Sequence, residues 1–164
     1  MNASHDTEYE QQILENVATY GCHVTMVFDP DGDEPGFAYS AGFAETVDQP
    51  EVIVFGLPNE TMHFMVNETL RQCRDGFRLK DWVEIDGLLE GHRCIARAVN
   101  PSFIIGDYFN SAMWLRRRLT GEQMTEAMQI VWPGAVDGLF PWDSGSSDIV
   151  REYQPALYEA GAIQ

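Results

Sequence analysis

The chain has 164 residues, of which 45% are hydrophobic and 12% aromatic, enough for one domain with a sizeable core. Its formal net charge of −16 favours solubility and speaks against direct binding to the phosphate backbone of nucleic acids. No run of 18 apolar residues occurs, and the first 20 residues are acidic and amphipathic, so neither a membrane span nor a secretory signal is supported. We therefore expect a single cytoplasmic domain over residues 1–164.

The acidic charge is unevenly distributed along the chain. Residues 1–70 contain 13 Asp and Glu and no Lys or Arg, whereas residues 71–118 hold nine of the ten basic residues. An acidic excess of this size would steer the protein toward cationic partners. The same excess is also compatible with a surface that is merely solvated.

The first predicted element is a helix over residues 7–20. A Thr-x-x-Glu sequence, which is the spacing of a capping box, opens the segment, and Gly21 can end it. Residues 22–28 are rich in β-formers and precede a segment dense in turn-forming residues. They should therefore pair with a strand over residues 37–43 as a hairpin.

Residues 51–57 are predicted to form a central strand. Positions 52–55 are an unbroken run of β-branched and aromatic residues, which is typical of a strand buried on both faces. A helix over residues 60–74 should follow, because its apolar side chains form one stripe at helical spacing.

The second half of the chain is predicted to add two strands within residues 82–99, a helix over 107–119 and a strand over 126–132. The predicted helix carries three consecutive arginines, at positions 116–118, which cannot all face the core. They are interpreted either as an ordinary cationic last turn or as a place to hold an anionic ligand.

Residues 144–164 look like a peripheral tail, with a short helix expected over residues 153–160. The elements together predict an α+β fold. It consists of one mixed central β-sheet of about six strands, packed by three main helices.

Four acids lie in the turn predicted between the first two strands: Asp29, Asp31, Asp33 and Glu34. The three aspartates have the 1-3-5 spacing of a calcium loop. Glu34 and Ser40, however, occupy the positions at which that loop needs Gly and a bidentate Glu. We interpret the turn as a concentrated negative charge and as a candidate for binding a basic protein.

The three cysteines, Cys22, Cys73 and Cys94, show no Cys-x-x-Cys spacing, which favours buried reduced thiols. A metal site would have to gather Cys22, His23, His92 and Cys94. On a strand, Cys22 and His23 point to opposite faces, so at most three of the four could converge. We predict no metal site and, since neither a dinucleotide-binding nor a P-loop motif occurs, no cofactor.

Five short motifs follow one another along the chain: YGCHV at residues 20–24, FAYSAGF at 37–43, PEVIVFGL at 50–57, QIVWP at 129–133 and GLFPWD at 138–143. In this order they resemble the motifs of the bacterial domain-of-unknown-function 4262 family, over about residues 8–143. The family usually has His-Pro-Glu where this chain has Gln49-Pro50-Glu51, and Pro-Asp where it has Pro133-Gly134. The resemblance implies no established activity.

A looser similarity links the aromatic-Ser-x-Gly strand and the Pro-Glu strand start to suppressor-of-fused-like domains, some of which act as immunity proteins against bacterial toxins. This similarity is an analogy of fold. The charge distribution and the absence of a nucleophile–base motif favour an acidic protein-binding module of immunity or regulatory type that engages a cationic partner.

The alternative function is that of a small-molecule-binding domain or an enzyme. Its support is that polar residues at the ends of core strands can converge on a cleft. The candidate lining residues are Tyr39, Ser40, Glu51, Trp132 and Trp142. The residues leave open whether the protein is an enzyme and which oligomeric state it adopts.

Overall fold

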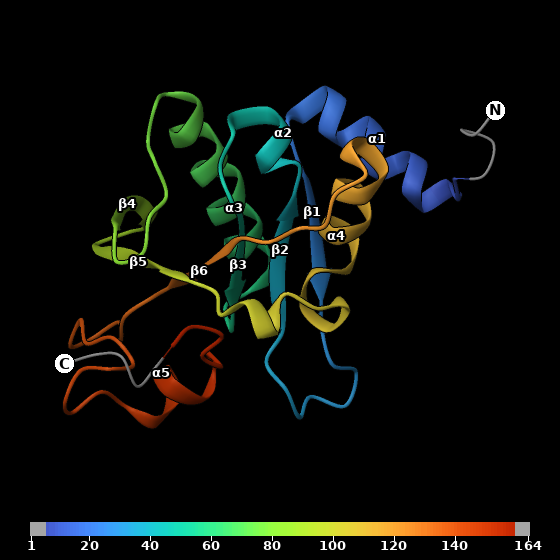
Figure 1. Cartoon of the computed structure of the whole chain (residues 1–164). Helices are drawn as coiled ribbons and strands as arrows, with labels where there is room; N and C mark the ends of the chain where they lie inside the picture. The colour runs from blue at the N-terminus through green and yellow to red at the C-terminus, as the bar shows by residue number, and fades with distance from the viewer. Residues whose placement is uncertain (1–5, 160–164) are drawn as a thin grey trace.

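Six strands form one mixed sheet, in the order β1-β2-β3-β6-β5-β4, in a computed structural model that describes residues 6–159 (Figure 1). Only β3 and β6 run parallel, and every other pair of neighbours is antiparallel. The predicted α+β fold with about six strands and three main helices is confirmed. The elements in chain order are α1 (Glu8–Tyr20), β1 (His23–Val27), β2 (Phe37–Ala41), α2 (Phe43–Val47), β3 (Glu51–Phe55), α3 (Asn59–Arg74), β4 (Glu84–Leu89), β5 (His92–Ala98), η2 (Pro101–Phe103), α4 (Gly106–Thr120), β6 (Ala127–Val131) and α5 (Asp148–Glu152).

The capping signals at the two ends of α1 act as the sequence predicts. Thr7 Oγ1 accepts the backbone N–H of Glu10 at 3.0 Å, and Glu10 Oε1 accepts the backbone N–H of Thr7 at 2.9 Å. Gly21 ends the helix with φ 99°, a left-handed conformation that glycine adopts without steric cost. The helix then leads directly into the edge strand β1.

The strand β3 lies at the centre of the sheet and is buried on both faces. Val52 and Val54 pack into the apolar core beneath α3, whereas Ile53 and Phe55 pack into a second core beneath α1 and α4. The three long helices therefore cover the sheet from both sides. This arrangement explains why the run at positions 52–55 contains no polar residue.

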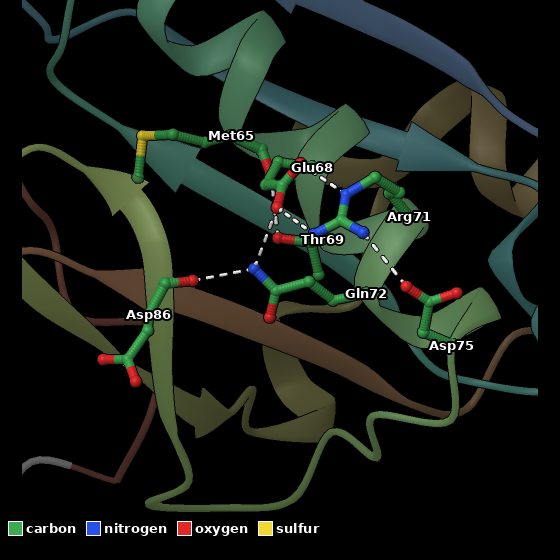
Figure 2. Close-up of polar contacts among 7 residues, drawn as sticks. All are labelled: Met65, Glu68, Thr69, Arg71, Gln72, Asp75 and Asp86. Atoms are coloured by element: carbon green, nitrogen blue, oxygen red, sulfur yellow. Dashed lines mark hydrogen bonds and ion pairs between the residues drawn. The ribbon is translucent and has the colours of Figure 1, made fainter.

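The C-terminal half of α3 is tied to β4 by the side chain of Gln72 (Figure 2). Gln72 Nε2 donates to the backbone oxygen of Asp86 at 2.7 Å and to Glu68 Oε2 at 3.2 Å. Arg71 forms ion pairs with Glu68 at 2.7 Å and with Asp75 at 3.0 Å. Arg71 thus has a complete structural explanation at the end of its helix.

The tail corrects two predictions. The helix expected over residues 153–160 is wrong in its described part: α5 ends at Glu152, and residues 153–159 are not helical, while Ala160 lies outside the described residues. The tail is not peripheral either, because Val150, Leu157 and Tyr158 are buried.

A buried glutamine explains why the tail runs extended after α5. Gln129, on β6, accepts the backbone N–H of Leu157 at 2.9 Å and donates to the backbone oxygen of Pro155 at 2.9 Å. The tail's backbone groups are therefore satisfied by a strand side chain instead of by helical partners. This contact joins residues about 26 positions apart, so local propensity could not reveal it.

No helix within residues 6–159 combines the length and the apolar character that crossing a membrane requires. All three cysteines are buried and free.

Candidate ligand-binding pocket

The side chain of Glu51 lies at the start of β3 and accepts hydrogen bonds from the turn that joins β2 to α2. Its Oε1 accepts the hydroxyl of Ser40 at 2.7 Å and the N–H of Phe43 at 3.0 Å. Its Oε2 accepts the N–H of Gly42 at 3.0 Å and, at a longer 3.4 Å, that of Ala44. Every one of these donors is electrically neutral.

Ser40 and Glu51 together connect three elements. Ser40 Oγ accepts the backbone N–H of Val52 at 3.0 Å while its hydroxyl donates to Glu51. Gly42 stands at the N-cap of α2, where it has φ 116° and no side chain that could cap the helix. The carboxylate of Glu51 supplies the missing acceptor. The sequence analysis missed α2 because its cap comes from a residue nine positions away from Gly42.

Burial dominates the electrostatics of this carboxyl group. Glu51 is only 6% exposed, and this desolvation raises its pKa to about 7, even though the hydrogen bonds from Ser40, Phe43 and Gly42 oppose the rise. Repulsion from the nearby Glu45 adds to it. A group with a pKa near neutrality can exchange a proton under ordinary conditions.

The three thiols behave differently from this carboxyl group. Burial raises the pKa of Cys22 to about 12, with the Glu51 carboxylate reinforcing the shift and Arg74 opposing it. Burial also raises the pKa of Cys73 to about 11 and that of Cys94 to about 12. None of them is poised as a thiolate nucleophile at neutral pH.

A cavity of about 330 Å³ opens beside Glu51. Its lining residues belong to α2, to α4 and to the segments at which the parallel strands β3 and β6 begin. The loop that follows α3 forms another side of it. Its polar and charged lining residues include Asp48, Gln49, Glu51, Arg78, Arg116 and Glu126.

Gln49 is an unusual member of this lining because it is only 4% exposed. Its Oε1 accepts the backbone N–H of Leu79 at 3.0 Å, which fixes the orientation of the side-chain amide. Among the described residues, no acceptor takes the N–H groups of that amide. The cavity is thus bordered by a buried carboxyl group and by a side-chain amide whose N–H groups have no acceptor among the described residues.

Of the five residues proposed from sequence to line one pocket, the structure brings together only Ser40 and Glu51. Ser40 and Glu51 are in direct contact, but the hydroxyl of Tyr39 accepts the backbone N–H of Ser111 at 2.9 Å, in the core beneath α4. Trp132 donates its indole N–H to the backbone oxygen of Phe55 at 2.7 Å, at the opposite end of β3.

Trp142 belongs to an aromatic cluster around a buried arginine. Arg97 is 2% exposed, and its guanidinium carbon lies 3.7 Å from the ring centre of Trp82, 4.6 Å from that of Tyr158 and 5.4 Å from that of Trp142. Its Nε donates to Asp81 Oδ1 at 2.9 Å. Cation–π contacts of this kind hold the tail against β5.

The acidic hairpin turn lies at the end of the sheet opposite to α2 (Figure 1). The Asp29 carboxylate accepts the backbone N–H groups of Asp31 at 3.0 Å and of Asp33 and Glu34 at 3.1 Å each. Asp29 therefore shapes the turn. The other three acids are exposed and, within residues 6–159, form no ion pair.

The sheet order separates the four residues that were considered as metal ligands. Cys22 and His23 lie at the β1 edge, whereas His92 and Cys94 lie on β5, with β2, β3 and β6 in between. In the described part of the chain, no three His, Cys, Asp or Glu side chains come close enough to hold a metal ion.

The sequence analysis missed most of the cavity lining. Gln49, Arg78, Arg116 and Glu126 come from four separate segments of the chain, so no local motif joins them. Two features of the sequence could have indicated part of this lining. Gln49 stands two positions before Glu51, and Arg116 belongs to the only run of three basic residues in the sequence.

A family model described as "Domain of unknown function (DUF4262)" matches residues 16–147. The chain belongs to this family. The match confirms the resemblance predicted from the five motifs, and it covers Ser40, Glu51 and every cavity residue named above. Comparisons with curated proteins and with solved structures gave no match.

Proposed function

We propose that this protein is a small-molecule-binding domain whose ligand occupies the cavity beside Glu51. The observation that carries the proposal is a buried carboxyl group, held by neutral donors alone, at the side of a polar cavity of about 330 Å³. Ligand sites in proteins typically enclose about 300–1,000 Å³. The proposal assigns binding and not a reaction.

The raised pKa of Glu51 supports a ligand site in addition to a structural role. Gly42 has φ 116°, and a Cβ there would lie 3.1 Å from the backbone oxygen of Gly21, so no side chain at this N-cap can close the turn and Glu51 closes it instead. Retaining a buried carboxyl group whose pKa is raised is costly, and such groups gather at functional sites.

Blocking the cavity should abolish ligand binding. Thr125 is exposed and lines the cavity, so Thr125→Trp places a large side chain in it without disturbing the core. We expect compounds that raise the melting temperature of the wild type by several degrees in a thermal-shift screen to leave that of Thr125→Trp unchanged.

The matched control is Thr19→Trp, since Thr19 is exposed near the end of α1 and does not line the cavity. It should respond to the same compounds as the wild type. If Thr125→Trp folds and still binds every compound as the wild type does, the ligand site lies elsewhere and the proposal is wrong.

A second candidate function is supported by the hairpin turn. We propose, as the alternative, that Asp31, Asp33 and Glu34 dock a basic protein surface, in an immunity or regulatory type of interaction. The support is that these exposed acids lie together at one end of the sheet, in a chain with a net charge of −16. Asp29 was predicted together with them, but its carboxylate shapes the turn and is not itself part of the docking surface.

Neutralising the turn tests this alternative. The triple variant Asp31→Asn, Asp33→Asn and Glu34→Gln keeps the Asp29 contacts to the backbone and should fold normally. Its association with a basic partner captured by the wild type should slow by about tenfold at low salt. The difference should shrink at 1 M salt, where the Debye length is about 3 Å.

The control for the turn variant removes the same charge from exposed acids on other parts of the chain: Glu15, Glu90 and Glu152, each replaced by Gln. An equal loss of association rate in both triple variants would mean that net charge, and not the turn, attracts the partner.

We also propose that the protein is bacterial and works in the cytoplasm. The three buried free thiols support a reducing compartment.

A further inference from the structure

The cavity beside Glu51 is surrounded by more acids than bases. Asp48, Glu51 and Glu126 line it on the acidic side, and Arg78 and Arg116 on the basic side. The charge of Arg116 is, however, already paired.

Two carboxylates outside the lining account for that pairing. Arg116 forms an ion pair with Glu45 at 3.0 Å and lies 3.8 Å from Glu122. With Arg116 paired, three acids of the lining, Asp48, Glu51 and Glu126, are left against one base, Arg78. The surroundings therefore favour a positively charged occupant.

The hydrogen bonds of Glu51 also favour a positively charged occupant of the cavity. Four neutral donors satisfy the oxygens of its carboxyl group, and no ion pair within residues 6–159 involves Glu51. A cation in the adjoining cavity would supply the missing positive charge in a site of low dielectric, where such an interaction is strong.

Gln49 adds a second requirement. Its side chain is largely buried and lines the cavity, and no described residue accepts its side-chain N–H groups, whose nitrogen keeps some accessible surface. These donors are free to bind an occupant, so one that offers an acceptor oxygen fits better than a bare cation.

We propose that the cavity binds an organic cation, an ammonium or guanidinium group, that carries a hydrogen-bond acceptor such as a carbonyl or carboxylate oxygen. The inference rests on the proposed function and names the ligand class of the same site. The cationic group could belong to a free small molecule or to a Lys or Arg side chain of a partner protein, and both sources present the same chemistry.

Arginine and citrulline form a matched pair of probes for this proposal. Both are used with the α-amino group acetylated, because citrulline would otherwise carry an ammonium group of its own. They then share their size and their carboxylate, and only arginine is cationic, since citrulline has a neutral ureido group in place of the guanidinium. We expect arginine to bind at least tenfold more tightly than citrulline, as measured by calorimetry and by NMR shifts of residues around Gln49. Thr125→Trp should abolish the binding of arginine.

Two charge variants test the acids at the cavity wall. Asp48→Asn and Glu126→Gln should each weaken the binding of arginine by several-fold, whereas Asp86→Asn, on β4 and outside the cavity, should not change it.

A blocked tripeptide with arginine at its centre distinguishes a free small molecule from the side chain of a partner protein as the source of the cation. Binding that is as tight as that of free arginine indicates a side chain of a partner, and loss of binding indicates a free molecule.

The binding of a cation should also depend on pH through Glu51. The titratable and charged groups on the elements packed around it are Cys22 before β1, Glu45 and Asp48 at α2, Arg78 after α3, Arg116 on α4 and Glu126 before β6. A cation stabilises the ionised form of Glu51, so arginine should bind more tightly at pH 8 than at pH 5 and should release protons near neutral pH. Calorimetry in buffers of different ionisation enthalpy measures that release.

Equal binding of arginine and citrulline, or binding of neither arginine nor the tripeptide, overturns the inference. A parallel screen of neutral and anionic compounds separates this failure from failure of the proposed function. If such compounds bind the wild type and not Thr125→Trp, the cavity is a ligand site with a different preference. If no compound of any charge distinguishes the two proteins, both proposals are wrong.

Discussion

Replacing Val54 with aspartate should leave the protein unfolded at room temperature. Val54 has no exposed surface and packs beneath α3 at the centre of the sheet. An unpaired carboxylate there costs several kcal/mol, against a total stability of about 5–15 kcal/mol for a domain. Circular dichroism and the dispersion of NMR signals measure the loss.

Val136→Asp is the matched control, because Val136 is 100% exposed in the loop after β6. It introduces the same charge and should melt within a few degrees of the wild type. A folded Val54→Asp protein with an unchanged melting temperature would contradict the central position of β3.

Glu51→Gln should remove a pH dependence of stability that the wild type possesses. Burial raises the pKa of Glu51 to about 7, whereas the carboxyl group of the unfolded chain keeps its ordinary value near 4.5. The folded state therefore binds a proton more tightly. Its stabilising contribution is fully present below pH 4.5 and is lost as the pH rises through about 7, an effect on the order of 3 kcal/mol.

The variant should consequently differ most from the wild type at low pH. At pH 5, Glu51→Gln should lower the free energy of unfolding by about 2 kcal/mol, because the new NH₂ group faces backbone donors that then lack an acceptor. By pH 8 the ionised and desolvated carboxylate costs the folded wild type a similar amount, so this difference should nearly vanish. Urea denaturation at pH 5, 6.5 and 8 measures it.

Glu126→Gln provides the control for this series, since Glu126 lines the same cavity but is exposed. Its difference from the wild type should stay small and constant across the three pH values. A constant difference for Glu51→Gln as well would show that Glu51 ionises at its ordinary pKa in the folded protein.

The candidate site shows how far sequence reasoning reached. Ser40 and Glu51 were both predicted as ligand-binding candidates, and they are in contact because β2 and β3 pair side by side. Tyr39 was grouped with them since it precedes Ser40. Tyr39, however, lies opposite Ile53 in the pairing of β2 with β3, and its side chain packs beneath α4, where its hydroxyl accepts the backbone N–H of Ser111.

The sequence by itself determined the long elements, the central strand at positions 52–55 and the family. Hydrophobic periodicity and helix caps act over a few residues, so each segment carries its own signal. Short elements such as α2, and the extended tail held by Gln129, were decided by acceptors and donors that lie far away in the chain.

The cavity was likewise decided only by the tertiary structure. Arg78 and Arg116 reach the same space as Glu51 because α3, α4 and the start of β6 converge at one end of the sheet, an arrangement that no residue spacing records. The raised pKa of Glu51 has the same origin. Desolvation is a property of the packed surroundings, so an identical Pro-Glu sequence on an exposed strand would titrate in the ordinary range.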